Sequence, residues 1–236
     1  MEKILIDYLE QNQNGSKTDW TNAGPVITIS RESGCSANRI ARGLAKVLNG
    51  FSALSSSAKQ SEWKWLNKEV VEQAANQLEI TPDKIKSVFL KEIDADLYDL
   101  QSAFSVERVY DADDEKVIGT LKSVIEGLAE RGNCIIIGRA ANIITSDIAA
   151  RLSVRLYAPL EWRIKQIMEV SSMNYTDSRD YVLGVDRQRD LFLRHLAGRD
   201  VLNTDFDMAF NLATMSSLQV VGAMVEVLKS KKLVAF

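Results

Sequence analysis

The sequence has few of the residues that define disulfide-rich, metal-binding or disordered proteins. Its 236 residues include only 2 cysteines, 3 prolines and 1 histidine. Cys35 and Cys134 lie far apart, and neither has a partner at metal-ligand spacing, so neither a disulfide framework nor a zinc site is predicted. With 12 glycines and no low-complexity tract, extended disorder is not expected either.

The net charge and the hydrophobic runs exclude further classes of protein. A formal net charge of -3 gives no general attraction to nucleic acid or to an anionic membrane. The longest uncharged stretch, residues 208–225, contains Asn, Thr, Ser and Gln, and is more typical of a buried strand and helix than of a membrane span. Residues 1–7 carry charges where a signal peptide needs an apolar run. We therefore expect a cytoplasmic protein whose partners include neither a nucleic-acid polymer nor a membrane.

The remaining composition, 46% hydrophobic and 26% charged, is that of a globular protein in which strand-like runs alternate with helical patterns. This alternation predicts parallel βαβ units with helices on both faces of one sheet. Ligands bind such sheets at the carboxyl ends of the strands. The predicted strands are 25–30, 134–137, 152–157 and 209–212, and the predicted helices are 37–48, 114–131, a segment after Pro159, 176–196 and 216–229.

One α/β domain is expected over residues 25–236, after an N-terminal helix and linker at 1–24. Residues 52–114 are polar and helical in pattern, and we predict a helical insertion there without a strand. Trp63 and Trp65 alternate as on a strand, but the charges between and before them fit an exposed helix start equally well. The insertion contains no base-specific motif.

The first predicted strand leads into residues 30–38, which have the position and small-residue character of a phosphate-binding loop. Such a loop works because backbone N–H groups and a helix N-terminus converge on the anion, while a lysine neutralises it and a hydroxyl holds Mg²⁺. Aligned on Gly34, the segment departs from G-x-x-x-x-G-K-[ST] at both glycines, the lysine and the hydroxyl residue, which are replaced by Arg31, Ser36, Ala37 and Asn38.

Several segments together resemble one family. The run at 27–32, followed by a small-residue turn, resembles the opening of the cytidylate kinase-like family, which commonly reads I-S-R-E-x-G-S-G-G and usually lacks the lysine. Further segments resemble the family motifs V-I-V-G-R-G-A-N, Y-A-P-x-E-x-R-I, D-x-x-R and Y-D-L-x-x-N in the same order, at residues 135–142, 157–164, 186–189 and 205–211. The resemblance covers most of residues 25–227.

The resemblance implies a P-loop NTPase-like, three-layer α/β/α fold with a mostly parallel sheet and an insertion of the type that binds a nucleoside monophosphate. It also implies a small-molecule nucleotide partner, with ATP and Mg²⁺ as cofactors. The implied reaction transfers the γ-phosphoryl group of ATP to a nucleoside monophosphate such as CMP, or to a related small acceptor. The alternatives are a catalytically inactive module that binds a nucleotide or another anion, which the altered loop favours, and a structural role without a ligand.

Arginines are the main candidate site residues. The resemblance places Arg139 on the acceptor nucleotide, where a guanidinium fits phosphate and base edges; the alternative is an ion pair that caps the sheet. Arg187 and Arg189 lie in a region similar to the kinase lid, with Asp186 expected to orient them. The alternative for these three is a set of ion pairs on an exposed helix face. Arg163 is expected to face the nucleotide base.

The loop supplies the other candidates. Arg31 is a candidate replacement for the missing lysine, and Glu32 lies near the expected metal position, although a salt bridge between this pair and the lid is the alternative. No metal ligand and no general base can be named. The apolar end at 233–236 offers a surface for a second copy, which leaves a homo-oligomer open. The backbone candidates for phosphate binding are Ser33, Gly34, Cys35, Ser36, Ala37 and Asn38, with Cys35 interpreted as a small loop residue and not as a reactive thiol.

Overall fold

A computed structural model describes residues 23–54, 62–67, 76 and 112–234 of the chain. Its centre is one sheet of five parallel strands in the order β2-β3-β1-β4-β5. The strand that leads into the candidate phosphate loop is therefore the middle one. The strands are β1 (Val26–Arg31), β2 (Lys64–Leu66), β3 (Cys134–Ile137), β4 (Arg151–Tyr157) and β5 (Met208–Asn211).

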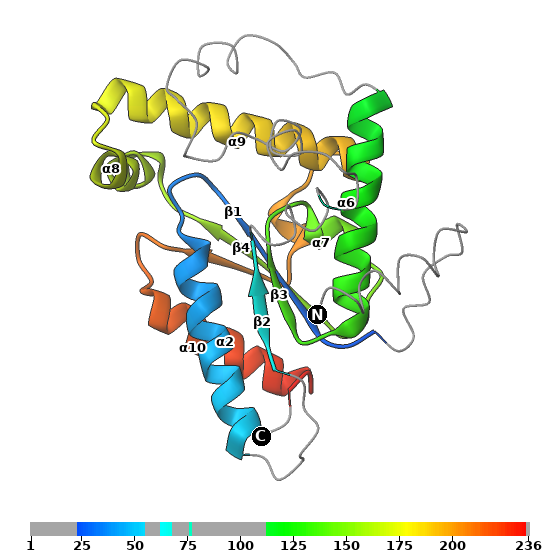
Figure 1. The fold of residues 1–236 in the computed structure, drawn as a ribbon. Helices are drawn as coiled ribbons and strands as arrows, with labels where there is room; N and C mark the ends of the chain where they lie inside the picture. The colour runs from blue at the N-terminus through cyan, green and yellow to red at the C-terminus, as the bar shows by residue number, and fades with distance from the viewer. Residues whose placement is uncertain (1–22, 55–61, 68–75, 77–111, 235–236) are drawn as a thin grey trace.

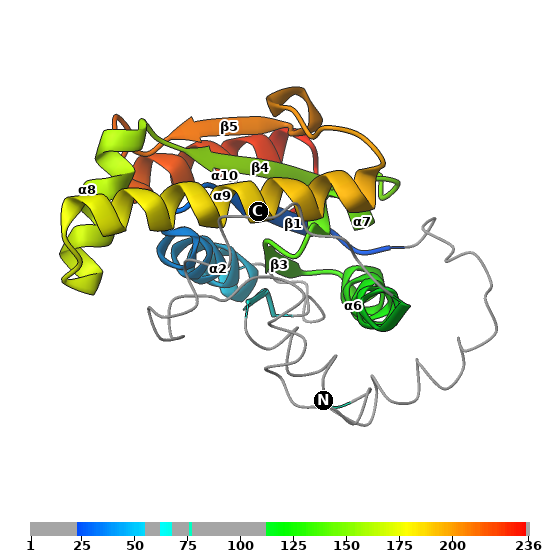
Figure 2. The ribbon, with the colours of Figure 1, turned by 90° about the horizontal axis from the view of Figure 1, so that it is seen from above.

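Helices cover both faces of the sheet (Figures 1 and 2). Alternate residues of β1 point to opposite faces, so that Ile27 and Ile29 pack with α2 and α10, whereas Val26 packs with α6. Two separate cores result, one on each side of the sheet, and the three-layer α/β/α fold is confirmed. The helices are α2 (Ala37–Leu54), α6 (Ala112–Arg131), α7 (Ala141–Ile144), α8 (Leu160–Ser171), α9 (Tyr175–Ala197) and α10 (Ser217–Ser230), with a short 3-10 turn, η3 (Asn203–Asp205).

Helix α9 lies across the edge at which the strands end, with α8 beside one end of it (Figure 1). It begins where the Asn174 side chain accepts a hydrogen bond from the N–H of Asp177, and it ends at Gly198, whose φ of 67° fits the left-handed region. These two caps fix a helix of 23 residues over the carboxyl ends of the strands. That placement positions the candidate site.

The strands at 25–30, 134–137, 152–157 and 209–212 were predicted to within one residue at each end, but the absence of a strand from 52–114 was wrong. Residues Lys64–Leu66 form β2, which pairs with β3 in the register Trp65↔Ile135. Trp63 before it is buried, and its backbone N–H and carbonyl both bind the Asn49 side chain, at 2.7 and 3.0 Å. A three-residue edge strand interrupted by charge leaves too little periodicity to be recognised.

Other sequence predictions lie outside the described residues. These are the N-terminal helix and linker, up to residue 22, and most of the helical insertion at 52–114. In the part of the chain that the structure describes, no helix has the length and apolar character needed to cross a bilayer.

Candidate functional site

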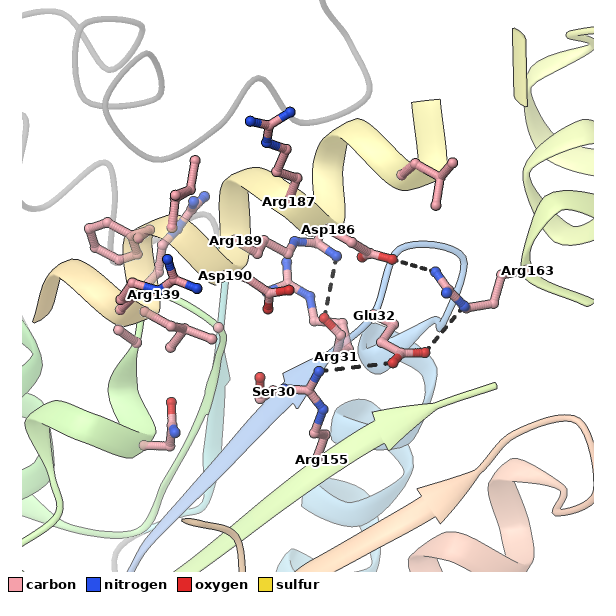
Figure 3. A pocket seen from close by; sticks show the side chains of 18 residues that line it. Ser30, Arg31, Glu32, Arg139, Arg155, Arg163, Asp186, Arg187, Arg189 and Asp190 are labelled. Atoms are coloured by element: carbon pink, nitrogen blue, oxygen red, sulfur yellow. Dashed lines mark hydrogen bonds and ion pairs between the residues drawn. The ribbon is translucent and has the colours of Figure 1, made fainter. Parts of the chain in front are cut away.

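A cavity of about 600 Å³ opens where β1, β3 and β4 end, beneath α9. Its walls come from the end of β1, the turn after β3, β4, α8 and the middle and C-terminal half of α9 (Figure 3). Arginine dominates this lining. Seven arginines line the cavity against three carboxylates: Arg31, Arg139, Arg155, Arg163, Arg187, Arg189 and Arg194, with Glu32, Asp186 and Asp190.

The spacing on α9 explains which of its side chains face the sheet. Residues three, four and seven positions apart share a helix face, which places Asp186, Arg189, Asp190 and Leu193 together. Arg189 approaches the loop, because its Nη1 donates to the carbonyl of Arg31 at 3.4 Å. Arg187 lies about a quarter-turn away on the helix, is exposed, and projects away from this group (Figure 3).

The turn after β3 holds Arg139 in an uncommon backbone conformation. Gly138, Arg139 and Ala140 have φ of 69°, 56° and 51°, so two non-glycine residues in succession are left-handed. The turn is anchored to the neighbouring strand by the Gly138 N–H, which donates to the Ile29 carbonyl at 3.0 Å. Strained turns of this kind occur where a side chain must be held in place, and here they hold Arg139 at the strand end.

Gly138 also lies close to the side chain of Arg31. The guanidinium of Arg31 lies directly against the Gly138 Cα, so that a Cβ at that position would collide with Arg31 Nη1. Arg31 therefore crosses from the end of β1 toward the turn after β3, and the absence of a side chain at Gly138 leaves room for it. Both arginines predicted from these two strand ends line the same cavity.

Arg163 connects three elements of the site. The residue is only 8% exposed, and its Nε lies 3.2 Å from Glu32 Oε2 while donating to the Ala158 carbonyl at 2.9 Å. Its Nη1 forms an ion pair with Asp186 on α9 and donates to the Ser33 carbonyl at 3.3 Å. Arg163 was predicted to face a nucleotide base, but in the structure it ties the loop to α8 and α9.

The backbone of the loop is also bound by these groups. The N–H of Ser33 donates to Asp186 Oδ1 at 2.7 Å. Gly34, with φ of 85°, packs so closely on α8 that a Cβ there would lie 2.8 Å from the Arg163 carbonyl. A carboxylate of the protein thus occupies one backbone donor of a loop whose donors would bind phosphate in a P-loop.

Two predicted roles differ from the contacts observed. Asp186 was expected to orient Arg187 and Arg189, yet its two oxygens bind Ser33 and Arg163. Glu32 was expected near a metal, but it pairs with Arg163, lies 3.9 Å from Arg155, and accepts the Ala158 N–H at 3.2 Å. The alternative of a salt bridge is thus observed for Glu32, with arginines of α8 and β4 and not of the lid.

The residues that the structure describes at the end of β1 do not fit a protein-held Mg²⁺ site. Glu32 is committed to arginines, and the position of the metal-binding hydroxyl is taken by Asn38. No group of three His, Cys, Asp or Glu side chains that could hold a metal ion occurs among the described residues.

The predicted site residues divide into two groups. Arg31, Arg139, Arg163, Asp186, Arg187 and Arg189 line the cavity, whereas the loop residues 33–38 do not. Within the loop, Ser33 and Cys35 are buried, Ser36 and Asn38 are exposed, and Ala37 begins α2. Burial, followed by the nearby Glu32 charge, raises the pKa of the Cys35 thiol to about 12, which fits a small loop residue and not a reactive thiol.

Four polar or charged lining residues were missed by sequence reasoning: Arg155, Asp190, Arg194 and Asn142. Arg155 could have been found in the sequence, because it interrupts the apolar run of β4. In the structure its guanidinium lies over the Phe206 ring, 5.6 Å from the ring centroid. Asp190 and Arg194 carry no comparable signal, since an Asp or Arg in a charged helix is usually solvated. Arg194, for example, also pairs outward with Asp200 at 2.6 Å. Asn142 carries no such signal either.

The parallel sheet, the loop after its central strand and the arginine cavity at the strand ends define an α/β protein of the P-loop kinase type. The model of the cytidylate kinase-like family matches residues 26–214, and the chain belongs to that family. Membership of this family places the protein in the class of kinase-like, nucleotide-binding proteins.

Several solved structures are similar to the chain at low sequence identity. The chain is similar to an uncharacterized protein from Eubacterium ventriosum, with a TM-score of 0.61 and 15% identity over 87% of this chain and 98% of the other. It is also similar to a shikimate kinase from Bacteroides thetaiotaomicron (TM-score 0.49, 11% identity, 87% and 98% covered) and a dephospho-CoA kinase from Campylobacter jejuni (0.37, 13%, 87% and 97%). A comparison with curated proteins finds no match.

Proposed function

We propose that this protein binds a nucleoside monophosphate, of which CMP is the first candidate, or a similar small phosphorylated molecule, in the arginine cavity. The observation that carries the proposal is the excess of arginines over carboxylates around about 600 Å³, seven against three, although Arg187 is exposed and projects away and Arg194 also pairs with Asp200. Guanidinium groups bind phosphate oxygens in pairs and stay charged at any physiological pH. A cavity of this size matches a small-molecule ligand.

The charge excess remains after the internal ion pairs are considered. Arg155 and Arg163 share Glu32, and Arg163 also binds Asp186. These pairs use two of the three carboxylates on two of the arginines, so the cavity keeps a net positive lining. An anion of charge about -2, such as a phosphate monoester, complements that lining.

A binding module without turnover fits the contacts of the loop best. The loop has no lysine, and its Ser33 N–H is satisfied by a carboxylate of the protein. An ATP phosphate would have to displace Asp186 to reach that donor. The cavity that would take the phosphorylated ligand does not depend on the loop backbone at residues 33–38.

The second candidate function is transfer of the γ-phosphoryl group of ATP to the ligand in the cavity, with Mg²⁺ bound to the nucleotide. It is favoured by Arg189 on α9, which lies over the cavity next to Arg31, because positioning and charge neutralisation carry most of the catalysis in this reaction class. No step is assigned to a general base.

Binding and turnover should be measured separately. Calorimetry with CMP, other nucleoside monophosphates and ATP tests binding, and chromatography after incubation with Mg-ATP tests product formation. Arg139→Ala should weaken binding of the monophosphate by tenfold or more, since a hydrogen bond to a charged group is worth about 1.5–3 kcal/mol. Arg179→Ala, on an exposed part of the same helix α9, is the matched control.

The outcomes separate the candidates. Monophosphate binding without product supports the binding module, whereas product formation lost in Arg139→Ala supports the kinase. Failure of every phosphorylated ligand to bind the unmodified protein, at concentrations up to millimolar, would reject both.

A further inference from the structure

Asn142 is a buried polar group of the cavity that no motif assigns. It lies on α7, directly after the left-handed turn at Arg139, and is 5% exposed while lining the cavity. Its main-chain carbonyl accepts a hydrogen bond from Arg151 Nη1 at 2.9 Å, but among the described residues its side-chain Nδ2 has no partner. Leaving a buried amide donor unsatisfied costs about 1–3 kcal/mol, so the position is expensive without a ligand or water.

Two buried hydroxyls lie deeper on the face of the sheet that carries the cavity. Thr28 and Ser153 are register partners on β1 and β4, and their side-chain oxygens also have no partner within the described part of the chain. Because strand residues two apart share a face, Thr28 lies behind Ser30 and Ser153 behind Arg155, both of which line the cavity. We call Thr28, Asn142 and Ser153 the polar floor.

The floor and the walls differ in chemistry. The walls carry guanidinium charges that suit phosphate, whereas Asn142 adds an uncharged amide to the lining, with the hydroxyls of Thr28 and Ser153 buried behind it. A ligand that satisfies both must join a phosphate to an uncharged part rich in hydroxyl or amide groups. Nucleosides and sugars have this chemistry, but inorganic phosphate and pyrophosphate do not.

We infer that Asn142 binds the uncharged part of the ligand and makes the cavity selective for a nucleoside or sugar phosphate over a simple phosphate. The inference rests on the proposed function, since it specifies what the same cavity accepts. A site built to hydrogen-bond a ligand group discriminates strongly against ligands without that group, because its own buried polar atoms then remain unpaired.

The test compares affinities across a ligand series that varies the uncharged part: CMP, 2′-deoxy-CMP, ribose 5-phosphate and pyrophosphate, each measured by calorimetry. In Asn142→Ala the affinity for CMP should fall about tenfold, as expected for one lost hydrogen bond of about 1.4 kcal/mol, while the affinity for pyrophosphate stays within about twofold. Asn203→Ala, at an exposed asparagine of η3, is the matched control and should change neither.

The outcomes distinguish this inference from the proposed function. An equal loss for every ligand, or no loss for any, would overturn the role of Asn142 while the effect of Arg139→Ala keeps the proposed function. If Asn142→Ala does not fold, the unmodified protein still tests the inference. If its affinity for CMP is no higher than its affinity for pyrophosphate, the proposed selectivity is overturned. If no phosphorylated ligand binds at all, both the inference and the proposed function fail.

Discussion

Replacement of Arg163 by methionine tests whether the ion pairs around the loop hold the site together. Methionine has similar length and no charge, so it fills the space while leaving Glu32 and Asp186 without their shared cation. It also removes the hydrogen bonds to the carbonyls of Ala158 and Ser33. Four groups therefore lose a partner through one substitution.

The structure sets the size of the effect. Removing one partner of a fully buried ion pair costs about 3–5 kcal/mol, because a charge is left uncompensated. Here the Arg163 side chain is 10% exposed, but those of Glu32 and Asp186 are 24% and 20% exposed, so both carboxylates recover some hydration. We expect Arg163→Met to lower the free energy of unfolding by about 2–4 kcal/mol. For a chain of this size that corresponds to a decrease in Tm of about 4–16 °C.

Denaturant unfolding followed by circular dichroism measures the change directly. The control is Arg179→Ala, which breaks a pair with Asp180 whose side chains are 49% and 52% exposed, and which should cost no more than about 1 kcal/mol. Adding Asp186→Asn to Arg163→Met should cost less than the sum of the single losses, because the two side chains interact. A loss below 1 kcal/mol for Arg163→Met, or strict additivity in the double variant, would refute the network as described.

Three further predictions concern charges and thiols. Asp190→Asn should tighten binding of a phosphorylated ligand several-fold in calorimetry, because it removes a negative charge from the cavity, and weaker binding would contradict the assignment. The thiols of Cys35 and Cys134, whose pKa burial raises to about 12, should react with iodoacetamide at pH 8 only after unfolding; rapid labelling of the folded protein would disprove their burial. The Arg199 guanidinium, then the Leu202 N–H, lower the pKa of Asp205 to about 2 from 3.8, so this residue stabilises the fold above about pH 4 and the stabilisation disappears as pH falls toward 2; Asp205→Asn should flatten acid unfolding in that range.

The fold could be predicted from sequence to the extent that each element has a periodic signature of its own. The run at 135–137 is apolar throughout, as expected of a strand covered on both faces, and it is buried in the structure. The three residues of β2 have no such signature, and their pairing with β3 depends on a partner about 70 residues away in sequence. A short edge strand such as β2 is therefore recognisable only after its neighbour β3 has been placed.

The site could be predicted where a residue follows a strand, but not where two distant side chains meet. Arg139 was identified because the end of a buried parallel strand is the usual ligand edge. The partner of Ser33 was not, because Asp186 is 153 residues away and its direction depends on how α9 crosses the sheet. Asn142 entered the sequence analysis only as the last residue of the segment at 135–142, since a buried Nδ2 without a partner among the described residues is not visible in the sequence.

The altered loop and the arginine cavity differ from a P-loop motif in the same respect, which is the position of the positive charge. Between residues 33 and 38 the loop has no cation, and one of its backbone donors is satisfied by Asp186. The positive charge comes from other elements, at Arg31, Arg139 and Arg189, which line the far side of the same strand ends. A phosphate bound there, as we propose, would contact side chains and not the loop backbone, so its binding would not require a P-loop motif. On the proposed function, the site would therefore recognise a phosphorylated ligand through side chains, although the Ser33 N–H of the loop is occupied by Asp186.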